Sequence, residues 1–256
     1  MRSGTQTLER GARLLRELAA RGTLGWRLSD LARRCELDKG TAHRLLACFV
    51  RERLVRRRSG DRRYVPGPLL FELSLALPGH AAFQAVAQRE LAAAADALDA
   101  YTFFCLRSGG DFVCAANSGR AAAKALEHDV GLRRPLVVSA GGMAILVALP
   151  SEESAHIVAE NLRRVKAAGE VRVKAVDRML RRSQAHGCGV HLSDIVPGVN
   201  TFAVAIHDSA GKPFASLSAA ARADDLPLAR LAAVVRTLEQ AAASISAHAA
   251  ALLEVG

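Results

Sequence analysis

The sequence predicts an α+β protein built from a small basic helical part and a larger neutral part. Residues 1–66 hold 17 Lys and Arg against 7 Asp and Glu, whereas residues 67–256 hold 18 of each. Apolar positions in the first part recur at helical spacing, and the second part alternates helical patterns with short β patterns. Pro66, Gly67 and Pro68 separate the two. We therefore expect three segments: a domain over 1–66, a linker helix over 67–79 and a domain over 80–256.

The composition is typical of a globular protein with reduced thiols. Half of the 256 residues are hydrophobic, which suits one large domain or two ordinary ones. No apolar run reaches the roughly 18 residues that span a bilayer, and the basic N-terminus lacks the apolar core of a secretory signal. Five cysteines, odd in number and never in a Cys-x-x-Cys pair, argue against a disulfide framework. We expect a cytoplasmic protein that does not enter membranes.

The basic part predicts three helices and a hairpin. Helical patterns cover about 5–21, 29–35 and 38–53, and the carboxylate of Asp38 can cap the third helix. Two short strands, at about 54–58 and 62–65, flank a polar turn that contains Gly60. A helix, a tight helix pair and a basic hairpin together predict a winged helix-turn-helix.

Basic side chains on the third helix and on the hairpin point to duplex DNA as the partner. We expect Lys39, Thr41, His43 and Arg44 in the major groove, with Arg44 the best candidate for a guanine edge. The wing would meet phosphates or enter the minor groove through Arg56, Arg57, Arg58, Arg62 and Arg63. For each wing arginine, a solvated surface position is the alternative. Only 4% of residues are aromatic, which disfavours a platform of stacked single-stranded bases.

The neutral part predicts an α+β domain of hairpins and helices. We expect strands near 101–107, 111–117, 136–138, 188–194, 200–207 and 213–220, and helices near 83–98, 140–149, 152–161, 173–186 and 227–253. Where a strand gives way to the helix at 140, exposed N–H groups of Ser139, Gly141, Gly142 and Met143 could bind a ligand carboxylate or carbonyl. Close packing of that helix on the sheet is the alternative.

The sequence supports neither a metal site nor a catalytic site. His186, Cys188 and His191, with Asp194 as a fourth group, do not match a zinc module, because a strand sends residues at odd separations to opposite faces. The chain has no Gly-x-Ser-x-Gly, Walker loop or dinucleotide fingerprint. We expect neither a cofactor nor an enzyme.

The chain resembles the IclR family of bacterial transcriptional regulators over nearly its whole length. The resemblance depends on several blocks in the expected order: 7–18, 28–32, 37–46, 64–67, 135–144, 187–189, 198–200 and 203–208. It implies a GAF-like effector-binding domain, a homodimer or dimer of dimers, and an effector cavity to which Asp194, Thr201 and Ser218 would also contribute. Gly40 departs from the family pattern, since it replaces the Ser of a Lys-Ser-Thr triplet that could hold a phosphate.

The predicted function is that of a sequence-specific transcriptional regulator, expected to be a repressor. A small organic metabolite in the C-terminal domain would change its affinity for a pseudo-palindromic operator. A shortage of aromatic residues near the expected cavity favours a small organic acid. One alternative is a structural DNA-binding protein that needs no ligand, and another is an enzyme with an accessory DNA-binding domain.

Overall fold

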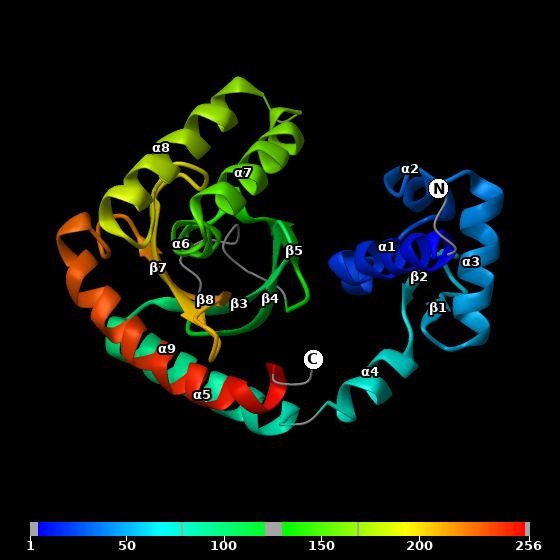
Figure 1. Ribbon diagram of the computed structural model, residues 1–256, viewed down its shortest axis with the longest axis horizontal. Helices are drawn as coiled ribbons and strands as arrows, with labels where there is room; N and C mark the ends of the chain where they lie inside the picture. Colours follow the sequence, from blue (N-terminus) through cyan, green and yellow to red (C-terminus); the bar gives the residue numbers. More distant parts are fainter. Residues whose placement is uncertain (1–4, 78, 121–129, 168, 254–256) are drawn as a thin grey trace. The chain divides into compact units, whose positions relative to one another are not determined.

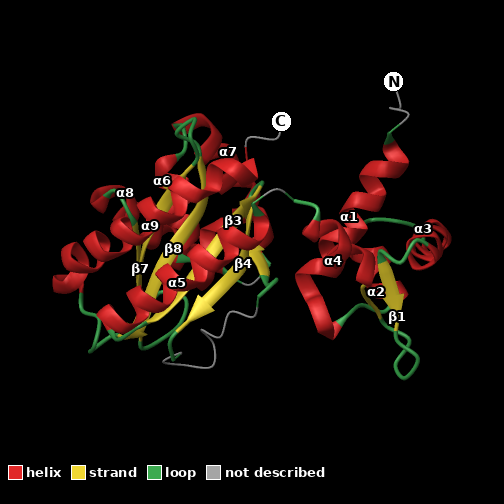
Figure 2. Cartoon of the chain, turned by 90° about the horizontal axis from the view of Figure 1, so that it is seen from below, coloured by secondary structure: helices red, strands yellow, loops and turns green. Residues whose placement is uncertain are grey.

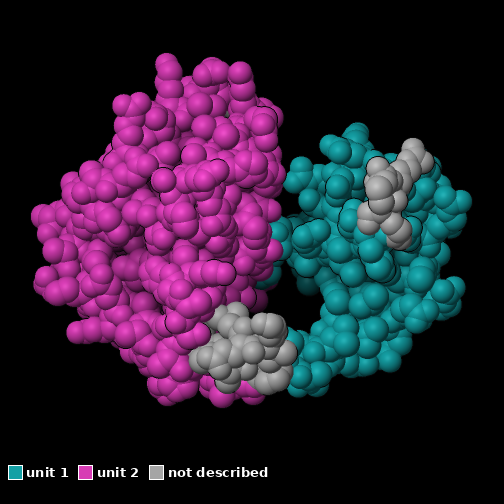
Figure 3. Space-filling model, viewed as in Figure 1, with its two compact units in different colours: residues 1–77, 131–133 teal, residues 78–130, 134–256 magenta. Residues whose placement is uncertain are grey.

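The computed structural model describes residues 5–77, 79–120, 130–167 and 169–253 of the chain, and these form two compact units (Figure 1). Unit 1 comprises residues 1–77 and 131–133, and unit 2 comprises residues 78–130 and 134–256 (Figure 3). The predicted architecture is confirmed: a winged helix-turn-helix and a linker helix precede an α+β domain.

Unit 1 consists of three helices, a two-stranded wing and a linker helix. Their bounds are α1 Gln6–Arg21, α2 Leu28–Arg34, α3 Lys39–Arg51, β1 Val55–Arg57, β2 Tyr64–Pro66 and α4 Pro68–Leu75. Leu14 and Leu18 of α1 are buried against Leu31 of α2 and Leu46 of α3. Each leucine removed from water contributes about 1.5–3 kcal/mol, so this small core fixes the angle between α2 and α3.

Unit 2 is built on one six-stranded sheet in the order β5-β4-β3-β8-β7-β6 (Figure 2). Its strands are β3 Tyr101–Ser108, β4 Asp111–Ser118, β5 Arg133–Pro135, β6 Gly189–Leu192, β7 Val199–His207 and β8 Pro213–Arg222. The helices are α5 His80–Leu98, α6 Ala140–Ala148, α7 Ser151–Lys166, α8 Glu170–His186 and α9 Leu231–Leu253. Antiparallel pairing joins β3 with β4 and β8, and β7 with β6 and β8.

Helices cover both faces of this sheet. Helices α5 and α9 lie side by side on one face, over a core that includes Phe104, Phe202 and Leu217 (Figure 1). Helix α6 lies on the other face, with α7 and α8 beyond it. Because side chains alternate along a strand, Thr201 and Ser218 point to the α6 face. The face under α6 is thus the polar one.

The strand expected at 136–138 is wrong. Leu136–Val138 forms a 3₁₀ turn, and the strand β5 lies just before it, at Arg133–Pro135. Pro135 has no N–H to continue a ladder, and the N–H of Val137 donates to the Asn161 side chain at 3.3 Å. Among the described residues, no single helix is long and apolar enough to cross a membrane. The helices α4 and α5, separated by a break, reach that limit together by length and composition only.

Candidate functional site

The N-terminus of α3 presents the predicted base-reading residues on one exposed side. The carboxylate of Asp38 caps the helix by accepting the N–H of Thr41 at 2.8 Å. Hydrogen bonding from Thr41 also holds the pKa of Asp38 below its usual range. Lys39, His43 and Arg44 are exposed, and the Nη2 of Arg44 lies 3.2 Å from the hydroxyl of Thr41. Three outward side chains on the first two turns of a capped helix suit insertion into a major groove.

Two of the five predicted wing arginines bond to the turn after α1. Arg58 donates to the carbonyl oxygens of Thr23 at 2.9 Å and Leu24 at 3.3 Å, and it forms an ion pair with Asp61 at 2.6 Å. Arg63 donates to the same Leu24 carbonyl at 3.0 Å and lies 3.4 Å from the Asp61 carboxylate. These bonds attach the wing to the turn after α1. Because these bonds hold both side chains against the turn after α1, Arg58 and Arg63 are poorer candidates for phosphate contacts than the other three arginines.

The other wing arginines face outward. Arg56 and Arg62 are exposed and make no ion pair with a described residue. Arg57 lies with its guanidinium carbon 5.6 Å from the centre of the Tyr64 ring and remains exposed. The sequence shows five equivalent arginines. Only the fold separates the two that hold the wing from the three that can meet DNA.

The glycines at the start of α6 pack too closely for a ligand to reach them. Ser139 caps the helix by accepting the N–H of Gly142 at 2.9 Å. A Cβ on Gly141 would lie 2.6 Å from the hydroxyl of Ser216, and one on Gly142 would lie 1.9 Å from the carbonyl oxygen of Leu136. Met143 is fully buried. These contacts favour the packing interpretation of residues 141–143 over the binding one.

A cavity of about 30 Å³ lies between α6 and the polar face of the sheet. It is lined by Phe103, Phe112, Arg134, Val138, Ser139, Ala140, His191, Ile195, Val196 and Thr201. Of the seven predicted effector residues, only Ser139 and Thr201 take part. The expected shortage of aromatic side chains is wrong here, because two phenylalanines form part of the wall. A volume of about 30 Å³ has room for about one water, so a metabolite could bind here only if the lining residues moved apart.

Two buried hydroxyls add to the polar character of this face. Ser216 and Ser218 are both fully buried on β8, and neither hydroxyl has a hydrogen-bond partner among the described residues. An unpartnered buried hydroxyl costs about 1–3 kcal/mol, which a ligand or a water could recover. Ser216 was not predicted, although the period of two along a strand places it on the face of Ser218.

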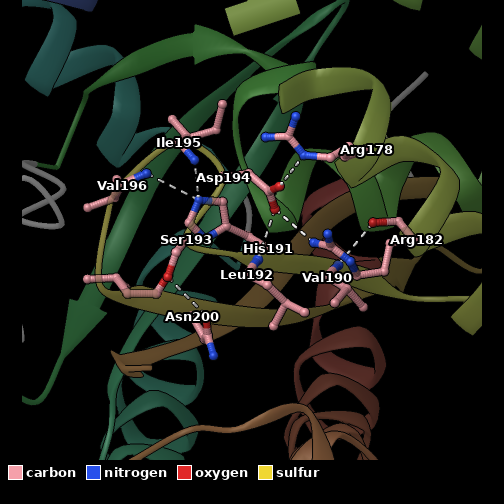
Figure 4. A network of polar contacts seen from close by, with 12 residues as sticks. Arg178, Arg182, Val190, His191, Leu192, Ser193, Asp194, Ile195, Val196 and Asn200 are labelled. Atoms are coloured by element: carbon pink, nitrogen blue, oxygen red, sulfur yellow. Dashed lines mark hydrogen bonds and ion pairs between the residues drawn. The ribbon is translucent and has the colours of Figure 1, made fainter. Parts of the chain in front are cut away.

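Asp194, a predicted effector residue, instead anchors the loop between β6 and β7 (Figure 4). Its side chain is 3% exposed and accepts from Arg178 at 3.3 Å, from Arg182 at 2.8 Å and from the N–H of Leu192 at 3.0 Å. Burial raises the pKa of this carboxyl, but hydrogen bonds from Arg182 and Leu192 outweigh burial and hold the pKa below its usual range. Asp194 does not line the cavity.

His191 fixes the same loop from the cavity side (Figure 4). Its Nε2 accepts the N–H groups of Ile195 at 2.9 Å and Val196 at 3.3 Å. Burial lowers the pKa of His191 to about 4, so the ring is neutral at pH 7. With Nε2 accepting, the proton is carried by Nδ1. The sequence suggested for His191 either a metal ligand or a partly exposed imidazole; instead it is buried and lies directly opposite Thr201 in the sheet.

Two larger cavities in unit 2 are less suited to binding a polar ligand. One, of about 340 Å³, lies between α6 and α9 beside Cys188, and the other, of about 570 Å³, lies between α7 and α8. None of the buried polar atoms that lack a partner in the described residues belongs to either lining. The smaller cavity under α6 is therefore the better candidate for recognising a polar ligand.

Comparison with protein families identifies the chain. Residues 7–59 match the IclR helix-turn-helix domain, and residues 80–247 match the bacterial transcriptional regulator IclR C-terminal domain. The chain belongs to the IclR family. This IclR regulator accordingly has a DNA-binding N-terminal domain and an effector-binding C-terminal domain, and it is not an enzyme.

Individual relatives agree with this assignment. The HTH-type transcriptional repressor AllR of Klebsiella pneumoniae is 29% identical over 118 residues, which cover 46% of this IclR regulator and 43% of AllR. The match thus spans less than half the length of this curated relative.

Solved structures share the fold along nearly the whole chain. An IclR family regulator from Brucella abortus has a TM-score of 0.73 at 22% identity, over 94% of this chain and 91% of that one. An IclR homolog from Microbacterium hydrocarbonoxydans, solved in complex with 4-hydroxybenzoate, has a TM-score of 0.67 at 23% identity, over 95% and 98%.

Proposed function

We propose that this IclR regulator is a cytoplasmic repressor that binds a pseudo-palindromic operator as a homodimer or dimer of dimers. The observation that carries the proposal is the exposed side of α3, where Lys39, His43 and Arg44 project from the first two turns of a helix capped by Asp38. A two-fold dimer presents two such helices and matches an operator with two half-sites. The relative AllR is itself described as a repressor.

A small organic metabolite in the cavity under α6 would control operator binding. The cavity contains the Ser139 and Thr201 side chains, and the Ser216 and Ser218 hydroxyls lie unpartnered on the same face of the sheet. A homolog of the same fold binds 4-hydroxybenzoate. Since the cavity holds only about 30 Å³, ligand entry must move its lining, and this movement couples the ligand to the rest of the molecule.

The wing would add affinity more than selectivity. Arg56, Arg57 and Arg62 face outward and would contact phosphates, whereas Arg58 and Arg63 would act by holding the wing in place.

A gel shift on the DNA upstream of the chain's own coding sequence tests the regulator function. We expect the binding to be salt-sensitive, and at physiological salt a scrambled duplex should compete poorly for the protein. Arg44→Ala should relax the preference at one base pair by about 1–3 kcal/mol, whereas Arg16→Ala, which removes the same charge from the exposed side of α1, should leave that preference unchanged. Equal binding of the scrambled duplex would instead indicate a structural DNA-binding protein.

A further inference from the structure

Two buried cysteines face each other across the sheet of unit 2. Cys105 of β3 lies directly opposite Cys114 of β4 in the antiparallel register, and both side chains are buried. Directly opposite residues of an antiparallel pair have Cα atoms about 4.5–5.5 Å apart. A disulfide joins residues whose Cα atoms are about 4.4–6.8 Å apart. The register therefore holds the two thiols within bonding reach, and neither forms a disulfide in the structure.

Both thiols point to the face of the sheet that α6 covers. Phe103 and Phe112 line the cavity under α6, and Cys105 and Cys114 each follow one of these phenylalanines by two positions on the same strand. Because side chains alternate along a strand, all four lie on one face. A β-bulge shifts the register between Phe104 and Cys105. Since a bulge interrupts the regular ladder, the two strands can adjust there to a new bond between them.

The two thiols interact with each other, in contrast to the remaining buried thiol of unit 2. Burial, and then the hydrogen bond with Cys114, raise the pKa of Cys105 well above its usual range. The Sγ of Cys114 also donates to the carbonyl oxygen of Ala116 at 3.7 Å. Cys188 directly precedes β6, at the edge of the sheet away from β4, so no thiol lies opposite it.

We propose that Cys105 and Cys114 are a modification site, at which hydrogen peroxide forms a disulfide that added thiols reduce again. In the first step the thiolate of one cysteine attacks the peroxide, so that an S–O bond forms, the O–O bond breaks and hydroxide leaves. In the second step the opposite thiol attacks this sulfenic acid, so that the S–S bond forms, the S–O bond breaks and water leaves. The two sulfurs lose two electrons, and the peroxide is reduced to water.

Burial determines which oxidant suits the pair and how fast it reacts. A low-molecular-weight disulfide would have to build a bulky mixed disulfide inside the sheet, whereas hydrogen peroxide is only slightly larger than water. Because the raised pKa of Cys105 leaves little thiolate, the pair should react more slowly than the half-buried Cys48. Its second step should be fast, since the resolving thiol is already in place.

The disulfide would also change the wall of the cavity under α6. An S–S bond of about 2.05 Å is shorter than the contact between two separate thiols, so its formation draws β3 and β4 together. Phe103 and Phe112 lie two residues away on these strands and move with them. In a cavity of only about 30 Å³, such a shift changes the space open to an effector. This consequence rests on the proposed function, whereas the disulfide itself does not.

Peptide mass spectrometry of the full chain tests the disulfide. The native protein is treated with hydrogen peroxide, the remaining thiols are blocked with N-ethylmaleimide in urea, and trypsin is added. Cleavage after Arg107 places the two cysteines in separate peptides, 90–107 and 108–120, each with a single cysteine. We expect these peptides to be joined in the oxidised protein and to separate after treatment with dithiothreitol.

The variants and the wild type give distinct outcomes. Cys105→Ala and Cys114→Ala should each abolish the joined peptides, whereas Cys188→Ala, which removes a buried thiol with no thiol opposite, should leave their yield unchanged. The wild type alone is decisive if a variant does not fold. The proposal is refuted if both peptides remain alkylated once Cys48 is fully oxidised, or if they join only when the chain is oxidised in urea.

Operator binding tests the consequence for the cavity separately. The gel shift is made in a Cys48→Ala background, because Cys48 lies on α3 and its oxidation would disturb that helix. Peroxide should change operator affinity by at least about fivefold, the lower end of typical coupling between sites, and Cys114→Ala should remove this response. A disulfide with unchanged affinity would refute the coupling to the cavity. Equal binding of a scrambled duplex would refute the proposed function and leave the disulfide result as it stands.

Discussion

Replacing Asp194 by Asn should destabilise unit 2 by about 2–3 kcal/mol, because this buried carboxylate accepts hydrogen bonds from three donors. Its two oxygens accept from Arg178, Arg182 and the N–H of Leu192. Asparagine keeps the shape but offers a single oxygen and no charge. Hydrogen bonds to charged groups contribute about 1.5–3 kcal/mol each when buried. The Arg178 side chain is 55% exposed, so its pair counts for under about 1 kcal/mol, and the pair with Arg182, 24% exposed, carries most of the effect.

Thermal unfolding measures this loss. At about 2–4 °C per kcal/mol for a domain of this size, the melting temperature should fall by roughly 4–12 °C. Asp177→Asn is the matched control, since it breaks an exposed ion pair with Arg181 on α8 and should cost under about 1 kcal/mol.

The stability that Asp194 contributes should depend on pH in one direction. Because the folded pKa of Asp194 lies below its unfolded value of about 3.9, its stabilisation is fully present above about pH 5 and disappears as the pH falls through the folded pKa. The difference between wild type and Asp194→Asn should be constant from about pH 5 to pH 8 and close at lower pH. Equal melting temperatures at pH 7, or a difference that grows on acidification, would refute this reasoning.

Three further predictions concern packing and the wing. Arg58→Ala should lower operator affinity and the stability of unit 1 together, because it frees the wing from the Leu24 carbonyl; a loss of affinity at unchanged melting temperature would show that Arg58 contacts DNA directly. Gly142→Ala should leave little folded protein, since its Cβ would lie 1.9 Å from the Leu136 carbonyl oxygen; normal yield and circular dichroism would contradict that packing. Iodoacetamide should label Cys48 first in the native protein, because the other four cysteines are buried, and peptide mass spectrometry would detect any other order.

The sequence by itself determined the elements that depend on local chemistry. Helix α3, proposed to read DNA, was predicted from a capping aspartate, a run of apolar residues at helical spacing and the basic side chains between them. The wing was predicted from two short strand patterns on either side of a polar turn. Period-two alternation placed most strands of unit 2, and it could also have placed Ser216 beside Ser218. Such signals are sufficient because helices, caps and hairpins are specified by residues that are close in the chain.

Tertiary structure alone decided what individual polar side chains do. Arg58 differs from Arg56 only because a turn more than thirty residues earlier presents its carbonyls to the wing. Asp194 was predicted at the ligand and instead holds two arginines of α8, while Arg134 was not predicted and lines the cavity. The role of a charged side chain depends on which distant groups share its surroundings, and no pattern along the chain contains those distances. A local motif therefore predicts an element, whereas a site exists only once the chain has folded.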